Sequence, residues 1–199
     1  MPGAMIGIIG KQRSGKTLIA YKMAKKLHLE AKERGEHLPI YTNLFVRNDD
    51  CFTYVNSIDE LPLDLSPKIV LIDEIYYGCD AQDYRKLKDI SIFINTIGKQ
   101  NCLFIWTSIG TDMVYNRIRN QSNLVILVKA DAKHIFYKLV FTDSMRQVDY
   151  MVAKTPNFFE GVNYDTQFIP LEFNWSMDGF KKKLAAFYEE HFGLSPMFN

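Results

Sequence analysis

The segment from Gly10 to Thr17 constrains the fold of this chain more than any other part of the sequence. It reads Gly-Lys-Gln-Arg-Ser-Gly-Lys-Thr, which matches the phosphate-binding P-loop pattern in full. In that motif, backbone N–H groups turn inward around phosphate oxygens, the lysine reaches the β and γ phosphates, and the threonine hydroxyl binds Mg²⁺. The predicted ATP-binding residues are therefore Gly10, Lys11, Gln12, Arg13, Ser14, Gly15, Lys16 and Thr17.

The segments on either side of this octet have the patterns that the motif requires. Met5 to Ile9 is a short apolar run, which predicts a strand buried on both faces. Thr17 to Glu33 carries an apolar stripe beside lysines, which predicts an amphipathic helix ending near Gly35. Because a strand precedes the loop and a helix follows it, phosphate binding is favoured over an ordinary glycine turn.

A pair of carboxylates follows another apolar run, Lys68 to Ile72. An acid at the C-terminal end of a buried parallel strand faces the crevice where ligands bind in open α/β sheets. We expect Asp73 to hold Mg²⁺ together with Thr17, and Glu74 to orient and deprotonate the attacking water. Acidic residues that follow strands often lie in solvated turns without a catalytic role, but the P-loop upstream favours the catalytic interpretation.

Strand and helix patterns alternate along the rest of the first 130 residues, which predicts right-handed crossovers and a mostly parallel sheet flanked by helices. The region 48–66 is polar and irregular, with Ser57 as a possible cap of one short turn. The further predicted strands are Leu38 to Val46, Cys102 to Thr107 and Leu124 to Val128, and the further predicted helices are Asp80 to Ile97 and Asp112 to Asn120.

The pattern changes after Lys129. His134 to Phe141 and Gln147 to Ala153 alternate around a turn, which predicts a β-hairpin. A loop is expected over 157–173, and an amphipathic helix over 176–192 with Phe180, Leu184, Phe187 and Tyr188 facing inward. We expect one α/β domain over 1–199, with a nucleotide-binding core in 1–130 and a hairpin and terminal helix in 131–199.

Composition adds few constraints. The formal net charge is +1, so contact with nucleic acid would require a local patch or an oligomer. The three cysteines, at positions 51, 79 and 102, show neither metal-ligand nor redox spacing and indicate reduced thiols in the cytoplasm. The apolar runs are far shorter than the roughly 20 residues that span a bilayer, so no membrane span is expected.

Three further groups of residues each have two interpretations. Thr107 and Ser108 end a predicted strand, where a hydroxyl can sense the γ-phosphate or simply satisfy local backbone. Arg117 and Arg119 can act in trans on the ATP of a neighbouring subunit, or lie on a solvated helix face. Lys181 to Lys183 can contact DNA phosphates, but the pattern favours a position on the solvent-exposed face of the last helix.

With these residues in view, the chain resembles the HerA/FtsK class of P-loop ATPases, and within it the small viral genome-packaging and zonula occludens toxin-like proteins. The resemblance covers roughly residues 5–170. The motifs that carry it are Gly10 to Thr17, Tyr41-Thr42-Asn43-Leu44, Leu71-Ile72-Asp73-Glu74, Gly98-Lys99-Gln100, Trp106-Thr107-Ser108 and Arg117-Ile118-Arg119. The class usually has a glutamine after the polar residue of the fourth strand, where this chain has Ser108-Ile109.

The resemblance implies a RecA-like ATPase that forms a homo-oligomeric ring and moves double-stranded DNA into a viral capsid. Mg²⁺ and ATP would be bound between subunits, and a capsid portal or another viral assembly protein would be a partner. The expected location is the cytoplasm of the host cell, or the virion. The alternatives are a membrane-associated assembly ATPase of the filamentous-phage type, a P-loop small-molecule kinase and a non-hydrolysing ATP switch.

Overall fold

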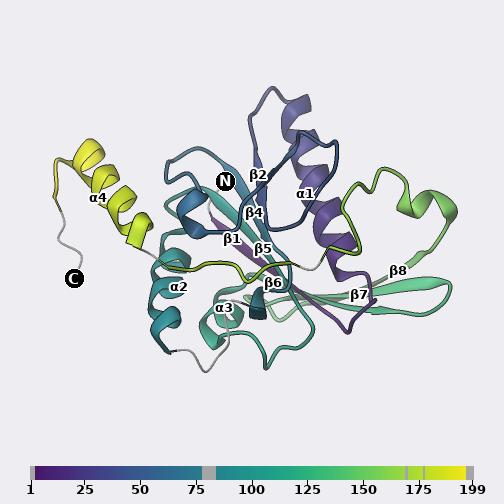
Figure 1. Ribbon diagram of the computed structural model, residues 1–199. Helices are drawn as coiled ribbons and strands as arrows, with labels where there is room; N and C mark the ends of the chain where they lie inside the picture. Colours follow the sequence, from purple (N-terminus) through teal and green to yellow (C-terminus); the bar gives the residue numbers. More distant parts are fainter. Residues whose placement is uncertain (1–2, 78–83, 169, 177, 196–199) are drawn as a thin grey trace.

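The computed structural model describes residues 3–77, 84–168, 170–176 and 178–195. It contains one eight-stranded sheet with helices on both faces (Figure 1). The strand order is β3-β2-β4-β5-β1-β6-β7-β8, parallel from β3 to β6 and antiparallel in the last two strands. The strands are β1 (Ala4–Ile9), β2 (Ile40–Thr42), β3 (Phe52–Tyr54), β4 (Lys68–Ile72), β5 (Cys102–Ser108), β6 (Leu124–Ala130), β7 (His134–Phe141) and β8 (Gln147–Ala153). This is the predicted α/β arrangement of a RecA-like P-loop NTPase fold.

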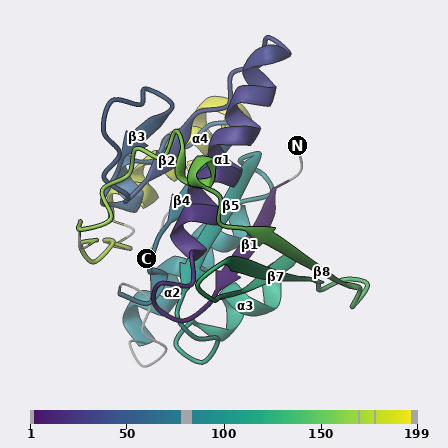
Figure 2. The same cartoon turned by 90° about the vertical axis from the view of Figure 1, so that its right-hand side faces the viewer.

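Two apolar layers hold the helices against the sheet. On one face, alanines of α1 such as Ala20 and Ala24 lie against Ile8 and Ile69 of the central strands. On the other face, α2 and α3 pack through Phe93 and similar residues (Figures 1 and 2). The strands β4 and β5 are buried along their whole length, as expected for strands covered on both faces. The helices are α1 (Lys16–Glu33), α2 (Tyr84–Thr96), α3 (Asn116–Gln121) and α4 (Asp178–Phe192), with short 3₁₀ turns η1 (Ile58–Glu60), η2 (Ile75–Tyr77) and η3 (Pro156–Phe159).

A close contact between Gly7 and Trp106 fixes the spacing of the two central strands. Gly7 lies opposite Trp106 in the β1–β5 register, and the indole is fully buried. A Cβ atom built on Gly7 would lie 2.3 Å from the ring atom Cζ2 of Trp106, so a larger residue cannot fit without movement. The indole N–H donates to Ser122 Oγ at 3.1 Å. This packing sets β1, and with it the P-loop, against β5.

The second predicted strand is wrong in its length. It was expected over Leu38 to Val46, but β2 contains only Ile40–Thr42. After that point side chains bind the backbone instead of a continuing ladder: Leu44 N–H donates to Thr42 Oγ1 at 3.1 Å, and Asn43 bonds to the residue that follows β4. The region 48–66 also contains the short strand β3, which was not predicted.

The predicted helix boundaries need smaller corrections. The helix expected from Asp112 begins at Asn116, because residues 111–115 form a turn that buries Val114. The expected start of the preceding helix, at Asp80, lies outside the described residues, as does Cys79, and the other two cysteines are free thiols. Ser57 caps η1 as predicted, accepting from Asp59 N–H at 3.2 Å.

The C-terminal part adds the predicted hairpin, a crossing segment and the last helix. Residues 156–168, called the strap below, pass over α1 from the end of β8 toward β2 (Figure 1). In α4, Phe180 and Leu184 are buried and Tyr188 packs against the core, but Phe187 instead stacks on His191 with ring centroids 4.3 Å apart. Within the described residues, no helix is long and apolar enough to cross a lipid bilayer.

Candidate nucleotide-binding site

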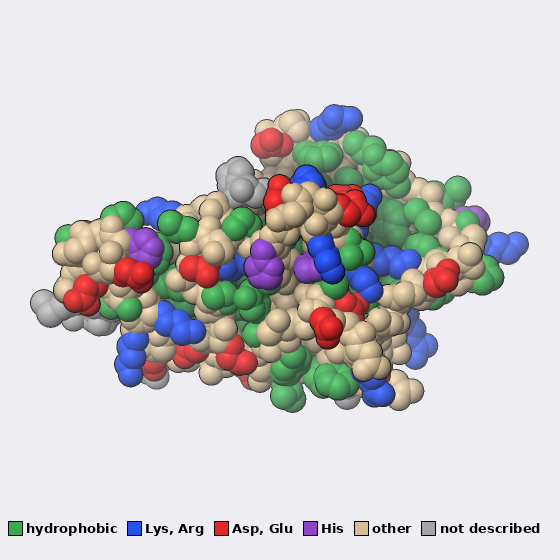
Figure 3. Space-filling view, turned by 90° about the horizontal axis from the view of Figure 1, so that it is seen from above, with side chains coloured by type: hydrophobic (Ala, Val, Ile, Leu, Met, Phe, Trp, Pro, Cys, Tyr) green, Lys and Arg blue, Asp and Glu red, His purple; other side chains and the backbone are tan. Residues whose placement is uncertain are grey.

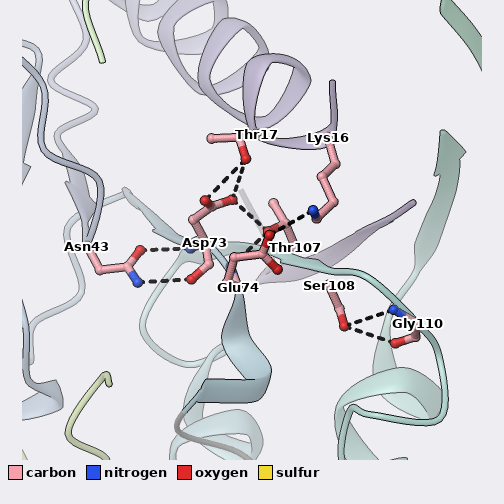
Figure 4. Close-up of polar contacts among 8 residues, drawn as sticks. All are labelled: Lys16, Thr17, Asn43, Asp73, Glu74, Thr107, Ser108 and Gly110. Atoms are coloured by element: carbon pink, nitrogen blue, oxygen red, sulfur yellow. Dashed lines mark hydrogen bonds and ion pairs between the residues drawn. The ribbon is translucent and has the colours of Figure 1, made fainter. Parts of the chain in front are cut away.

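Five of the predicted site residues come together at the C-terminal ends of β1, β4 and β5: Lys16, Thr17, Asp73, Glu74 and Thr107 (Figure 4). Lys16 opens α1 directly after Gly15, whose φ of 93° lies in the left-handed region that glycine adopts without strain. The Lys16 ammonium lies 2.7 Å from Glu74 Oε1, and both side chains are largely buried. The lysine of the P-loop is thus paired with one of the two acids that follow β4.

Two hydroxyl groups hold the carboxylate of Asp73. Thr17 donates to both of its carboxylate oxygens, at 3.0 and 3.2 Å, and Thr107 donates to Oδ1 at 2.6 Å (Figure 4). Thr107 Oγ1 also accepts from the backbone N–H of Glu74 at 2.9 Å. One hydroxyl therefore connects β5 to both acids of the neighbouring strand.

Asn43 fixes the backbone of Asp73, a role that the sequence did not reveal. Its side-chain amide donates to Asp73 C=O at 3.0 Å, and its carbonyl accepts from Asp73 N–H at 2.7 Å (Figure 4). Asn43 itself is buried. The available signal was an amide residue at the expected end of a strand next to β4, where a polar side chain points into the same crevice.

Glu74 has a backbone conformation that few residues other than glycine adopt. Its φ is 50°, in the left-handed region. Strain of this kind costs of the order of 1 kcal/mol or more and is concentrated at functional sites. The second carboxylate oxygen, Oε2, is buried and has no hydrogen-bond partner. The strained residue therefore presents a free acceptor inside the site.

Burial has the largest effect on the pKa of Asp73. It raises the pKa of the carboxyl group from an ordinary value of 3.8 to about 6; hydrogen bonds from Thr107 and Thr17 act in the opposite direction, and the nearby charge of Glu74 adds to the increase. The fold thus keeps an ionisable acid at a position where its charge is costly without a cation nearby.

A cleft of about 370 Å³ lies over these residues. The P-loop, Asp73 and Glu74 form its inner wall, and Phe159, Tyr164 and neighbouring strap residues form the outer wall. The hydroxyl of Tyr21 and the Lys25 ammonium both donate to Gly161 C=O, which ties the strap to α1. Burial, together with the charge of Asp73, raises the pKa of Tyr164 to about 12. The strap therefore closes one side of the cleft.

The P-loop has the shape and the free polar groups that phosphate binding requires. A Cβ atom on Gly10 would come within 2.5 Å of Ser14 Oγ and of Val128 C=O, so only glycine fits there. Ser14 Oγ is buried without a hydrogen-bond partner. The oxygen atoms of Thr17 and Asp73 suit Mg²⁺, which commonly takes one or two protein ligands plus phosphate and water. The residues present fit both ATP and the metal.

The side chains of the remaining candidate residues do not join this cluster. The Ser108 hydroxyl bonds Gly110 C=O at 2.9 Å in a local turn and points away from Asp73 (Figure 4). Arg117 is exposed on α3, and Arg119 donates to Asn116 Oδ1 on the same helix. Neither arginine is among the described residues that line the cleft of its own chain.

No known family profile matches this sequence, and no curated protein matches it either. Solved structures share the fold. The N-terminal domain of zonular occludens toxin from Neisseria meningitidis superposes with a TM-score of 0.61 at 16% identity, over 83% of this chain and 100% of that domain. The genome-packaging NTPase B204 of Sulfolobus turreted icosahedral virus 2, in complex with AMPPCP, has a TM-score of 0.54 at 10% identity, over 75% of this chain and 97% of B204. The structure of B204 described as a DNA-packaging ATPase from Sulfolobus turreted icosahedral virus gives 0.55 at 11% identity, over 75% and 98%. The chain therefore has the fold of these P-loop NTPases.

Proposed function

We propose that this protein is an ATP-hydrolysing motor that moves double-stranded DNA into a viral capsid. In this proposal the motor is a ring of identical subunits. The observation that carries the ATPase part is the contact of Lys16 with Glu74 beside the cluster of Thr17, Asp73 and Thr107. This cluster combines a phosphate-binding lysine, two oxygen ligands for a metal and an acid with a free acceptor oxygen. All of them lie at the C-terminal ends of the central strands.

Each residue has a distinct role in this proposal. Lys16 exchanges its contact with Glu74 for the β and γ phosphates and stabilises the transferred phosphoryl group. Glu74, released from the ion pair, accepts a proton from the attacking water. Thr17 and Asp73 would hold Mg²⁺, which would neutralise charge on the phosphate oxygens when bound. Thr107 and Asn43 keep Asp73 in place.

Similarity to B204, itself described as a genome-packaging NTPase, supports DNA as the cargo. Ring assembly explains how a subunit with a net charge of +1 can hold a polyanion, because several copies direct a few basic groups toward one channel. In this proposal a capsid portal or a similar assembly protein receives the DNA, and the motor works in the host cytoplasm or on the virion.

An arginine of the neighbouring subunit completes the site in this proposal. Neither Arg117 nor Arg119 lines the cleft of its own chain, and Arg117 is exposed, which favours a role at the site of a neighbouring subunit. An Arg119→Ala subunit keeps its own P-loop, and a Lys16→Ala subunit keeps its own arginine. Mixing the two inactive variants should restore part of the hydrolysis, because some sites then combine two intact halves. No restoration at any mixing ratio argues against the trans site, and Arg117→Ala serves as the parallel test.

The ATPase proposal is tested with Glu74→Gln. This variant should bind ATP but turn over at least a hundredfold more slowly, because glutamine cannot accept the proton. Arg34→Ala, on the exposed surface and away from the cleft, is a control that should hydrolyse like the wild type. Hydrolysis should also rise steeply with protein concentration and with double-stranded DNA. An unimpaired rate for Glu74→Gln would remove this residue from its role.

A membrane-associated particle-assembly ATPase is the second candidate. This alternative follows from the resemblance to zonula occludens toxin-like proteins, and the N-terminal domain of one of them is matched over its whole length. Co-sedimentation with lipid vesicles and with a membrane partner separates it from a DNA motor. A P-loop kinase is distinguished by turnover that requires an acceptor molecule, whereas the motor hydrolyses ATP in water alone.

A further inference from the structure

One face of the β6–β8 region is apolar and open. Leu127, Phe136 and Met151 are 36%, 39% and 62% exposed. In the strand register Met151 lies opposite Phe136, and Phe136 opposite Lys129, while Leu127 lies opposite Lys138. These side chains line a groove of about 430 Å³, called the hairpin groove below. An exposed patch of this kind on a sheet is typical of an interaction surface.

The hairpin groove continues to the P-loop. A second hollow of about 630 Å³ is lined by residues 9–14 and by the end of β6, and Leu127 and Lys129 line both cavities. The charged groups along this path are mostly basic: Lys11, Arg13, Lys129 and Lys138 lie there with one acid, Asp149, which is 3.9 Å from Lys138. The surface from the hairpin groove to the P-loop therefore combines exposed apolar side chains with more positive than negative charges.

The end of α4 has the complementary character. Its rings cluster together: Phe187 stacks on His191, and Tyr188 lies 5.6 Å from Phe192. Phe192 and Leu194 are nevertheless 61% and 57% exposed. Glu189 and Glu190 are exposed beside them, and the lysines of this helix are confined to its first half. We call residues 187–194 the α4 tip; acidic and hydrophobic side chains appear together at this end of the molecule in Figure 3.

We propose that the α4 tip of one copy docks into the hairpin groove of the next copy. The two surfaces lie at opposite ends of the molecule, as Figure 1 shows, so one chain cannot satisfy its own groove. The contact is head-to-tail, and such a heterologous interface generates a ring if its rotation closes. Glu189 and Glu190 lie near Lys129 and Lys138 in this contact, and Phe192 and Leu194 cover Phe136 and Met151.

This inference specifies the contact between the subunits of the proposed ring. The purpose of the ring rests on the proposed function, but the contact itself does not. Because the hairpin groove adjoins the hollow lined by residues 9–14, a docked tip lies beside the phosphate-binding loop of its neighbour. Assembly and nucleotide binding should then influence each other, since binding at two sites that share a structural element is reciprocal.

The test is the mass of the 199-residue chain by sedimentation velocity, with and without Mg-ATP, over a range of salt concentrations. Met151→Glu places a charge in the groove, and Phe192→Ser removes the largest exposed ring of the tip. Each should weaken self-association at least tenfold and leave a 23.1 kDa monomer. Met145→Glu, in the hairpin turn where Met145 is 70% exposed, and Leu65→Ser are the matched controls and should assemble like the wild type.

Mixing identifies the direction of the contact. A Met151→Glu subunit keeps its tip and a Phe192→Ser subunit keeps its groove, so the mixture should form a one-to-one dimer and nothing larger. Lys129→Glu and Glu190→Lys should each weaken assembly, and together they should restore it. Circular dichroism spectra unchanged from the wild type show that the variants are folded.

Several results would overturn the proposal. These are a wild-type monomer under all conditions, assembly by either single variant alone, or a mixture that stays monomeric. If Lys129→Glu weakens binding to DNA but leaves the mass unchanged, the groove serves nucleic acid and not a second copy. Assembly without any ATP hydrolysis would retain this inference while the proposed function fails. Hydrolysis by a strict monomer would overturn this inference together with the ring, and would retain only the ATPase site.

Discussion

Replacing Asp73 by asparagine should make the folded protein more stable while it abolishes turnover. Asp73 is 5% exposed, and its neighbours include the like charge of Glu74. Asparagine has nearly the same shape, and its single carbonyl oxygen can accept the hydrogen bonds that Thr17 and Thr107 donate to Oδ1. The substitution therefore removes a buried charge with little change in packing.

The magnitude follows from the pKa of this group. Burial and the charge of Glu74 raise it from 3.8 to about 6 in the folded protein. At 1.36 kcal/mol for each pKa unit, ionisation of Asp73 costs the folded state about 3 kcal/mol above pH 6. A raised pKa contributes stability below pH 4 that is lost as the pH rises through 6. Asp73→Asn should thus gain about 2–3 kcal/mol at pH 7.5 and about half of that at pH 5.

The assay is urea unfolding of wild type and variant at both pH values, without nucleotide and with a chelator, because Mg²⁺ would offset the buried charge. Asp49→Asn is the control for sign. Burial disfavours ionisation there too, but hydrogen bonds from Lys25, Cys51 and Tyr21 outweigh it and lower the pKa, so that variant should lose stability at pH 7.5. Equal or lower stability of Asp73→Asn at pH 7.5, or a gain that does not shrink at pH 5, refutes the reasoning.

Three other substitutions test the packing around the site. Gly7→Ala should destabilise the fold by about 2 kcal/mol or more, because its Cβ atom would overlap the buried Trp106 ring; urea unfolding measures this, and a neutral effect would contradict the fixed spacing of β1 and β5. Asn43→Ala should cost about 1–3 kcal/mol and also lower the hydrolysis rate, because it leaves buried backbone groups of Asp73 unpaired; a change in stability alone would limit Asn43 to a structural role. Arg47→Ala should change stability by less than about 1 kcal/mol, since the Arg47 side chain is 65% exposed and its ion pair with Asp165 is screened by water; a larger loss in a thermal melt would mean that this pair anchors the strap.

The sequence predicted the parts of the site that depend on local patterns. The order of strand, P-loop and helix is encoded within some thirty residues, and Asp73 follows an apolar strand whose neighbours in a parallel sheet are limited by right-handed crossovers. The polar ends of β4 and β5 were therefore expected near the P-loop. The structure adds the distances, such as 2.6 Å between Thr107 Oγ1 and Asp73 Oδ1.

The parts that were missed depend on contacts between distant residues. β2 stops at Thr42 because the side chain of Asn43 turns to the backbone of Asp73, thirty positions away, and β propensity carries no information on such a bond. The sequence predicted the strap only as a loop. Its place beside the cleft depends on hydrogen bonds from Tyr21 and Lys25 to Gly161 C=O, and these residues are far apart in the sequence. Phe187 was assigned to the core from helical spacing alone, but α4 extends past the surface that buries its first half.

The strain at Glu74 and the burial of Asp73 have a common explanation. Both are unfavourable in the protein alone, and both place negative charge next to Lys16 and Thr17, where a nucleotide with its metal would bind. Sites of this kind trade stability for activity. The same reasoning accounts for the buried, unpartnered oxygens of Ser14 and Glu74, which would gain partners when the cleft is filled.

The central claim is most directly tested by a crystal structure with Mg²⁺ and a non-hydrolysable ATP analogue. The account predicts that the Lys16 ammonium has left Glu74 for the β and γ phosphates, and that Thr17 and Asp73 both face the metal. A triphosphate bound away from residues 10–17, with the 2.7 Å contact between Lys16 and Glu74 intact, would contradict it.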